Sequence, residues 1–330
     1  MAQELKGTLG DQHDCQFASD PRRNEDLGAK LRDRHVLIAG AGRGIGRATA
    51  EFFAYANVKS LSLTALELDE VDETAQSCKK INPKLLTKTA AFDVRDYNKV
   101  QQFVDEVHGE FGRIDVLFMN AGRPPQWLPV HESDPEVWWD TVAISLQGAF
   151  NFSRAALPLL RNQKGGRIIF TASAGAHMDR GMGSYTIGKL GLVRLSEILH
   201  HENKDYNVKA FAIHPGSVRT RFFTDFQDAV DGKIKPNSYV PSAMEGDKKS
   251  AELVVSLFGN AVWDTPQMPA GLVVVLASGG LDFMSGRYVD ATKKVEDYIA
   301  AKDKIAAEDL HRVKLVAGDG VLLPYNPEDQ

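Results

Sequence analysis

The sequence predicts an α/β fold with three layers (α/β/α): a doubly wound parallel sheet between two layers of helices, in a single domain. Short apolar segments alternate with amphipathic helical segments from residue 35 to residue 290. This alternation is typical of parallel strands joined by helical crossovers. A glycine-rich turn follows the first apolar segment, where such sheets bind nucleotides.

The same alternation predicts each element in chain order. The expected strands are Val36–Ala39, Ser60–Thr64, Thr89–Phe92, Ile114–Met119, Arg167–Thr171 and Val208–Ile213. The helices expected between them are Arg47–Tyr55, Asp69–Lys80, Val100–Phe111, Glu136–Leu160 and Tyr185–His201. The apolar run Leu272–Ala277 and the segment Arg287–Asp290 are then expected to return to the sheet.

Segments that depart from the alternation suggest the domain boundaries. Residues 1–34 are polar and mixed in charge, which predicts an N-terminal arm before the domain of residues 35–290. Within the domain, residues 218–250 contain prolines and scattered charges and are interpreted as a lid or substrate loop. Residues 291–330 predict a charged C-terminal helix followed by an extended tail.

The composition excludes several classes of protein. With 43% hydrophobic and 25% charged residues, the chain has the usage of a globular protein and not that of a disordered or collagen-like one. The net charge of -5 argues against nucleic acid as a partner. Cys15 and Cys78 show no metal or redox spacing, and no apolar run approaches the ~20 residues of a membrane helix. From these two observations we expect no metal site and no membrane partner. The ends show no targeting signal, so we expect a cytoplasmic location.

The glycine-rich turn has the spacing G-x3-G-x-G, with Gly40, Gly44 and Gly46 as its glycines. The G-x-G-x-x-G fingerprint of Rossmann-type folds would need glycine at Ile45. Either spacing allows a tight turn and close approach of a pyrophosphate to a helix N-terminus. A flexible turn of small residues is the alternative, but the position after the first strand favours a dinucleotide.

A tyrosine and a lysine four residues apart, Tyr185 and Lys189, lie on one face of a predicted helix. Lowering the pKa of a phenol from ~10 to ~7 requires ~4 kcal/mol. One cation at ~4 Å in an effective dielectric of ~20 supplies about that much. The pair therefore predicts a tyrosine acid/base assisted by lysine; a surface pair on an amphipathic helix is the alternative. Ser173 ends the strand just upstream, where it is either a ligand to a substrate oxygen or a turn-forming serine.

Together these motifs closely resemble the short-chain dehydrogenase/reductase (SDR) family over about residues 35–290, and the tail resembles that of fungal members. The matching segments are Ala39–Gly46, Asp93-Val94, Asn120-Ala121-Gly122, Tyr185 with Lys189, and His214–Thr220. The resemblance implies that the cofactor is bound by Gly40, Arg43, Gly44, Ile45, Gly46, Asp93, Val94, Asn120, Ala121, Gly122, Tyr185, Lys189, Pro215, Gly216, Val218 and Thr220.

The resemblance also implies a mechanism. Tyr185 exchanges a proton with the substrate oxygen, Lys189 lowers the pKa of the tyrosine and holds the nicotinamide ribose, and Ser173 polarises the substrate oxygen. Ser145 stands where the family has a catalytic asparagine, whose backbone carbonyl any residue can provide. Counting back from the tyrosine puts Ala172 at the serine position, whereas alignment along the strand puts Ser173 there, and we prefer Ser173.

The cofactor and substrate are less strongly marked. At the end of the second strand, Ala65 and Leu66 offer no acid to bind a ribose hydroxyl, and Glu67 lies one or two positions beyond the usual place of that acid. Arg43 resembles the basic residue of many NADPH users. We therefore favour NADP(H) over NAD(H). Aromatic residues in and near the lid favour a bulky, apolar carbonyl or alcohol substrate, unless they only anchor the lid; they are Trp127, Phe222, Phe223, Phe226 and Tyr239.

Further implications of the resemblance concern assembly and rival functions. Trp138 and Trp139 lie on the long helix that this family uses for subunit contacts, together with the Tyr185 helix, which implies a homodimer or homotetramer. The leading hypothesis is an NADP(H)-dependent carbonyl reductase or alcohol dehydrogenase. An SDR-fold cyclase or isomerase without net redox, and a nucleotide-binding redox sensor, are the alternatives.

Overall fold

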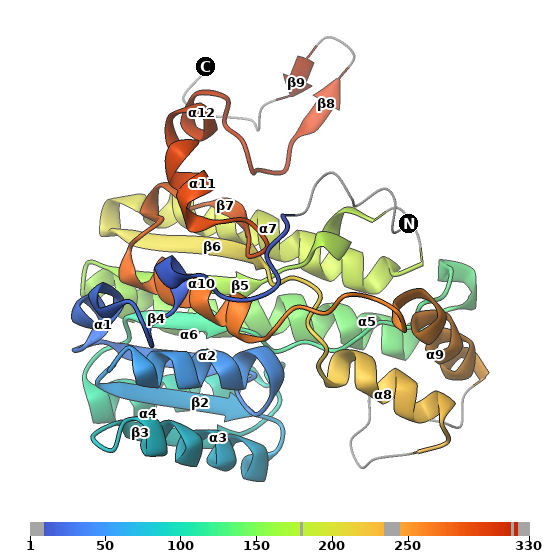
Figure 1. Cartoon of the computed structure of the whole chain (residues 1–330), viewed down its shortest axis with the longest axis horizontal. Coiled ribbons are helices and arrows are strands. Elements are labelled where there is room, and N and C mark those ends of the chain that lie inside the picture. Colours follow the sequence, from blue (N-terminus) through green and yellow to red (C-terminus); the bar gives the residue numbers. More distant parts are fainter. Residues whose placement is uncertain (1–9, 179–180, 234–244, 318–319, 323–330) are drawn as a thin grey trace.

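A computed structural model describes residues 10–178, 181–233, 245–317 and 320–322. Its centre is a seven-stranded parallel sheet with the order β3-β2-β1-β4-β5-β6-β7 (Figure 1). The strands are β1 (His35–Ala39), β2 (Ser60–Ala65), β3 (Leu86–Ala91), β4 (Val116–Met119), β5 (Gly166–Thr171), β6 (Val208–His214) and β7 (Arg287–Asp290). The doubly wound fold is confirmed. The strand order reverses between β1 and β4, and ligands bind at such a switch point.

The two faces of the sheet are covered by two sets of helices. One core cluster joins β1 residues Val36 and Ile38 to α2 (Gly44–Tyr55), α3 (Leu68–Ile81) and α10 (Gln267–Ser278). A second cluster joins Leu37 of the same strand to the helices of the opposite face. Those helices are α4 (Tyr97–Phe111), α6 (Gly148–Asn162) and α7 (Gly183–Asn203). Because both faces are buried, the central strand β4 is apolar along its whole length, and β1 is apolar from Val36 to Ala39.

The long helix predicted at Glu136–Leu160 is a continuous helical segment with an irregular centre. Asp134 caps α5 (Pro135–Val142) by accepting a hydrogen bond from the backbone amide of Val137, with 3.0 Å between the atoms. A π-helical turn over Ala143–Gln147 then leads into α6. Such turns are frequent at functional sites because they disturb the regular hydrogen bonding of a helix.

The apolar run Leu272–Ala277 does not return to the sheet, so that prediction was wrong. It forms the centre of α10, which packs against α2 on one side and against the N-terminal segments around Phe17–Ser19 and α1 (Glu25–Leu31) on the other. A helix that is buried on all sides has no polar face, and its apolar run then has the same pattern as a buried strand.

The segment predicted as a loop at 218–250 is also different. Thr220 caps α8 (Arg221–Val230), and α9 (Glu245–Phe258) packs against it. Both helices lie beyond the carboxyl ends of the strands (Figure 1). The remainder of the predicted lid, residues 234–244, lies outside the described residues.

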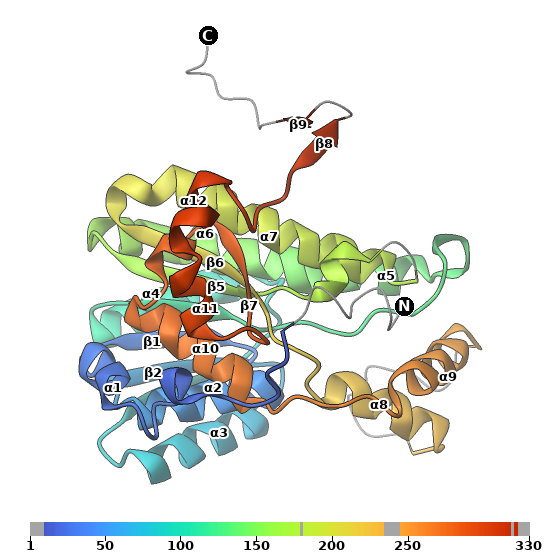
Figure 2. The same ribbon diagram turned by 45° about the horizontal axis from the view of Figure 1, so that its top comes forward.

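The two flanking segments are folded onto the domain more closely than their composition indicates. Leu27 and Leu31 of α1 are buried in the core beside α10. At the other end, where one helix and a tail were expected, the chain forms α11 (Val295–Ala300), α12 (Lys302–Ala307) and a hairpin of β8 (Leu315–Ala317) and β9 (Gly320–Leu322). The hairpin projects away from the sheet (Figure 2). Within the described ranges, no helix is long and apolar enough to cross a membrane.

Candidate active site

A cavity of about 540 Å³ lies at the carboxyl ends of the central strands, at the switch point between β1 and β4. Its walls bring together most of the residues predicted to bind a cofactor. These are Gly40, Arg43, Gly44, Ile45, Asp93, Val94, Asn120, Ala121, Gly122, Lys189, Pro215, Gly216, Val218 and Thr220. Gly46, Ser145, Ser173 and Tyr185 are not among the lining residues.

The glycine-rich loop requires its glycines for close packing. A side-chain carbon at Gly46 would lie 1.9 Å from the carbonyl oxygen of Gly40, which itself has a φ of +84°. At Gly44, with a φ of +55°, such a carbon would lie 2.8 Å from Cγ2 of Thr220. Arg43 is the N-cap of α2 but makes no side-chain hydrogen bond to the amides of its first turn. The loop therefore presents a helix N-terminus to the cavity, a geometry that suits an anion.

Asn120 connects this loop to the neighbouring strand. Its Nδ2 donates a hydrogen bond to the carbonyl oxygen of Gly40 at 2.9 Å, and its Oδ1 accepts one from the hydroxyl of Thr171 at 3.1 Å. Thr171 ends β5 and also lines the cavity. The side chain of Asn120 thus fixes the relative position of the glycine loop and the strand that leads to Ser173.

Asp93 is held by an arginine at one end of the cavity. Although burial opposes ionisation, hydrogen bonds from the side chain and the backbone amide of Arg95 keep the pKa of Asp93 below its ordinary value. Arg95 also donates to Asp140 of α5 at 2.5 Å. The carboxylate of Asp93 is therefore ionised and fixed in place at neutral pH.

Lys189, Tyr185 and Ser173 form a cluster next to the end of β5. The Nζ of Lys189 donates to the backbone oxygen of Thr171 at 2.7 Å and lies 5.5 Å from the centre of the Tyr185 ring. The hydroxyl of Ser173 hydrogen-bonds the Tyr185 side chain and accepts from the amide of Gly175 at 3.0 Å. Ala172 instead is fully buried beside Val193, so Ser173 is the residue that faces the tyrosine.

The charge state of this cluster is dominated by burial. Burial lowers the pKa of Lys189 to about 8. Burial also raises the pKa of Tyr185 to about 12, and the Ser173 hydrogen bond opposes that rise. With its pKa raised in this way, the Tyr185 phenol is protonated at neutral pH. The lowering toward ~7 expected from Lys189 stays a prediction.

Ser145 lies in the π-helical turn Ala143–Gln147, close to Lys189. The residue is 3% exposed, and its hydroxyl has no hydrogen-bond partner within the described part of the chain. A side-chain carbon added at Gly122 would lie 3.4 Å from the Nζ of Lys189 and 3.9 Å from the Oγ of Ser145. The orphaned hydroxyl and the ammonium group are therefore neighbours across Gly122.

The aromatic residues of the predicted lid divide into two groups. Phe222 lines the cavity and lies edge-on against Tyr185, with 5.4 Å between ring centres. Phe223, Phe226 and Trp127 are buried in a separate cluster with Met182, where they anchor α8. Tyr239 lies outside the described residues. Phe223, Phe226 and Trp127 therefore serve packing, and the contact of Phe222 with an apolar substrate stays a prediction.

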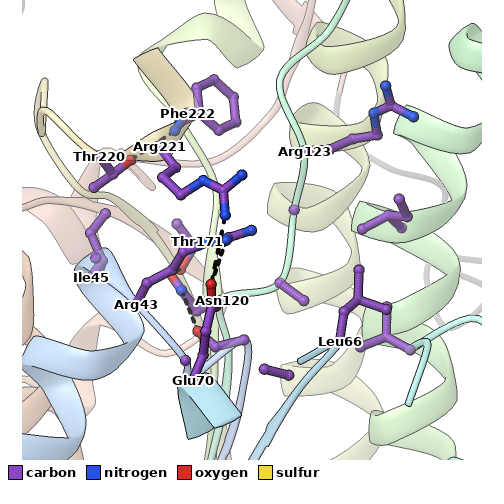
Figure 3. Close-up of a pocket in the computed structure, with 18 of the residues that line it drawn as sticks. Arg43, Ile45, Leu66, Glu70, Asn120, Arg123, Thr171, Thr220, Arg221 and Phe222 are labelled. Atoms are coloured by element: carbon purple, nitrogen blue, oxygen red, sulfur yellow. Dashed lines mark hydrogen bonds and ion pairs between the residues drawn. The ribbon is translucent and has the colours of Figure 1, made fainter. Parts of the chain in front are cut away.

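Sequence reasoning missed several charged residues of the cavity wall. Arg221 and Glu70 lie on one side together with Arg43, and Arg123 lies across the cavity from them (Figure 3). Arg221 directly follows the motif that ends at Thr220, which was a usable signal. Glu70 belongs to the first turn of α3, and no local pattern indicates that this turn reaches the cavity. In the portion of the chain that the structure covers, no group of three His, Cys, Asp or Glu side chains could hold a metal ion.

Comparison with known proteins is consistent with this site. Residues 34–231 match the model of the short chain dehydrogenase family. The short chain dehydrogenases mpl6 of Monascus purpureus and citE of Monascus ruber are each 34% identical over 295 residues, covering 87% of this chain and 90% of the relative. Levodione reductase is 26% identical and superposes with a TM-score of 0.68, over 79% of this chain and 96% of its own. NAD+-bound xylitol dehydrogenase is 25% identical with a TM-score of 0.65, over 78% and 96%.

The fold, the site and these matches define the class of protein: the chain belongs to the short-chain dehydrogenase/reductase family of oxidoreductases. The relatives mpl6 and citE are proteins of the fungal genus Monascus.

Proposed function

We propose that the protein is an NADP(H)-preferring oxidoreductase that interconverts a ketone or aldehyde and an alcohol on a bulky, apolar substrate. The observation that carries the proposal is the placement of two groups at one cavity. A glycine loop at a helix N-terminus lies on its wall, and Lys189, which lines the same cavity, belongs to the cluster with Tyr185 and Ser173 beside it. Membership of the family and the resemblance to a solved levodione reductase support the same reaction class.

The wall of the cavity fits a nicotinamide dinucleotide. The amides at the start of α2 would bind its pyrophosphate, Asp93 would accept a hydrogen bond from its adenine, and Lys189 would hold the ribose at the nicotinamide end. Pro215, Gly216, Val218 and Thr220 would contact the nicotinamide. The bound cofactor supplies or accepts the hydride.

The protein's own side chains donate and accept the proton. Tyr185, protonated at neutral pH, donates its proton to the substrate oxygen during reduction and accepts one during oxidation. Ser173 donates a hydrogen bond to the same oxygen. Lys189 stabilises the phenolate that remains, because opposite charges attract strongly at a buried site. Ser145 and the irregular backbone around it would hold a water through which the proton returns to solvent.

Arg43 supports the preference for NADP(H). It lines the cavity beside Ala65 and Leu66 at the end of β2, where neither residue is acidic. An arginine at this place accommodates the extra phosphate of NADP(H). Phe222 supports an apolar substrate, since it covers the phenol of Tyr185 with an aromatic ring.

Exposed apolar side chains support a homodimer or homotetramer. Trp139 on α5, Phe150 on α6 and Ile187 on α7 are 65%, 54% and 51% exposed, and such residues on adjoining helices are typical of an interface. Light scattering after chromatography tests this: Trp139→Arg is expected to shift the mass toward the monomer. The cytoplasmic location predicted from the sequence stays a prediction.

The reaction is tested with a panel of carbonyl compounds and NADPH, followed by the loss of absorbance of the reduced nicotinamide. The expected result is turnover of apolar ketones or aldehydes by the wild-type protein, at least about a hundredfold faster than by Tyr185→Phe. Cofactor binding without oxidation of NADPH or reduction of NADP+ on any carbonyl or alcohol would instead favour the cyclase, isomerase or sensor alternatives.

A further inference from the structure

We propose that Glu70 is a specificity-determining residue of the cofactor site: its carboxylate weakens the preference for a 2′-phosphorylated dinucleotide by neutralising Arg43 and by placing negative charge at the end of β2. The inference rests on the proposed function, because it concerns the cofactor of the same cavity. It adds a residue that the glycine loop and the strand ends do not indicate.

Glu70 lies at the position where a dinucleotide fold selects its cofactor. A side-chain carbon at Gly42 would lie 2.9 Å from Oε2 of Glu70 and 3.2 Å from Cβ of Ala65, so the carboxylate stands directly beside the end of β2. Dinucleotide-binding folds place an acid here to bind the ribose hydroxyl of NAD, or an arginine to accommodate the phosphate of NADP. In this chain the end of the strand has no acid, but two carboxylates just after it line the cavity: Glu67, the N-cap of α3, and Glu70 in its first turn. Of the two, Glu70 makes the hydrogen bond to Arg43.

Two arginines contact the carboxylate of Glu70. Its Oε1 accepts a hydrogen bond from Nη1 of Arg43 at 2.8 Å and lies 3.6 Å from Nη1 of Arg221 (Figure 3). Arg221 is also held by the fully buried carboxylate of Asp225, with 3.0 Å between Nε and Oδ1. Arg221 therefore has the Asp225 carboxylate as well as Glu70, and Glu70 offsets part of the charge of Arg43.

Arg43 and Glu70 are accessible to a ligand in the cavity. The side chains of Arg43 and Glu70 are 28% and 30% exposed, and both line the cavity. A 2′-phosphate that binds Arg43 must therefore share the guanidinium with Glu70 and bear the repulsion of its charge. A free ribose hydroxyl meets no such repulsion and can donate to the same carboxylate. Glu70 thus disfavours NADPH relative to NADH.

The test is the ratio of the dissociation constants of NADH and NADPH, measured by calorimetry at one ionic strength. Glu70→Gln removes the charge but keeps the shape of the side chain, and is expected to shift the ratio about tenfold toward NADPH. Glu73→Gln is the matched control: it lies on the same helix, is 69% exposed and does not line the cavity. Its ratio is expected to equal that of the wild type.

A double-mutant cycle with Arg43→Gln separates the pair from a general charge effect. The gain in NADPH affinity from Glu70→Gln is expected to shrink to about a third or less in the Arg43→Gln background. An unchanged ratio in Glu70→Gln, with both nucleotides still bound, overturns the inference and leaves the proposed function intact. If the wild-type protein binds neither nucleotide, the proposed function fails and the inference fails with it.

Discussion

Phe222 lies edge-on against Tyr185, with 5.4 Å between the ring centres and 60° between the ring planes. Phe222 belongs to the first turn of α8, whose neighbouring residues Thr220 and Arg221 line the cavity. Phe223 and Phe226 of the same helix anchor it in the buried cluster with Trp127 and Met182. One helix therefore contacts both the wall of the predicted cofactor site and the predicted proton donor.

This contact predicts how Phe222→Ala behaves. Losing an aromatic wall removes apolar contact with the substrate, so the KM for a bulky apolar carbonyl is expected to rise about tenfold. The dissociation constant of NADPH is expected to stay within twofold. Steady-state kinetics with one bulky and one small carbonyl measure the effect, and Val230→Ala, an exposed position on the same helix, is the control. Equal changes in KM for both substrates would contradict the role of Phe222.

The assignment of Tyr185 predicts a separation of chemistry from binding. Tyr185→Phe keeps the ring but removes the acidic proton, so kcat is expected to fall by about 10² to 10⁴ while the NADPH dissociation constant stays within threefold. Tyr206→Phe, at an exposed position on the protein surface, is expected to keep wild-type turnover. Turnover that survives in Tyr185→Phe would refute the role of the phenol as proton donor.

Burial of Lys189 predicts a pH dependence of stability. Its pKa falls to about 8 in the folded protein, from an ordinary value of 10.5. Between these values the unfolded chain binds the extra proton, so the free energy of unfolding rises with pH over this window; below pH 8 both states are charged and the cost of burial is fully present. Because the pKa of Tyr185 is raised to about 12, this residue acts in the opposite direction only above about pH 10.

The measurement is denaturant unfolding of the wild type and of Lys189→Met between pH 7.5 and pH 10. The free energy of unfolding of the wild type is expected to gain about 2 kcal/mol on that of the variant across this range. The lost hydrogen bond to Thr171 adds a nearly constant offset and leaves the trend unchanged. Parallel curves for the two proteins would show that Lys189 is not desolvated.

Asp264 links the N-terminal segment to the loop Pro215–Val218, which lines the cavity. Its Oδ2 accepts from the amide of Ser217 at 2.5 Å, and its Oδ1 contacts Nδ1 of His13 at 2.6 Å. Asp264→Asn weakens the hold on the loop that precedes Val218, and the KM for cofactor is expected to rise about tenfold. His13→Ala is expected to have a smaller effect, because the His13 side chain is 58% exposed. An unchanged KM in Asp264→Asn would disprove the link.

The sequence predicted the parts of this fold that depend on local pattern. The strands from Val36 to Ile213 and the helices between them were found because the apolar period changes with each element. The run Leu272–Ala277 was misassigned because a helix buried on every side loses its polar face. The helix α8 was missed because Pro236 and Pro241 follow it within one segment of scattered charges, although Arg221–Val230 itself contains no proline.

The candidate site shows the same division. The glycine loop, Asn120 and the Tyr185–Lys189 pair were visible because fixed spacings on single elements define them. Alignment along the strand favoured Ser173 over Ala172, and the full burial of Ala172 supports that choice. Glu70 could not be predicted, because only the tertiary packing of α3 and α8 brings its carboxylate to the guanidinium of Arg221.

The most direct test of the central claim is a titration of the wild-type protein with NADPH and then with NADH, followed by the fluorescence of its four tryptophans. The account predicts saturable quenching by both nucleotides, with the lower dissociation constant for NADPH. Quenching by neither nucleotide would contradict the account of the cavity as a dinucleotide site.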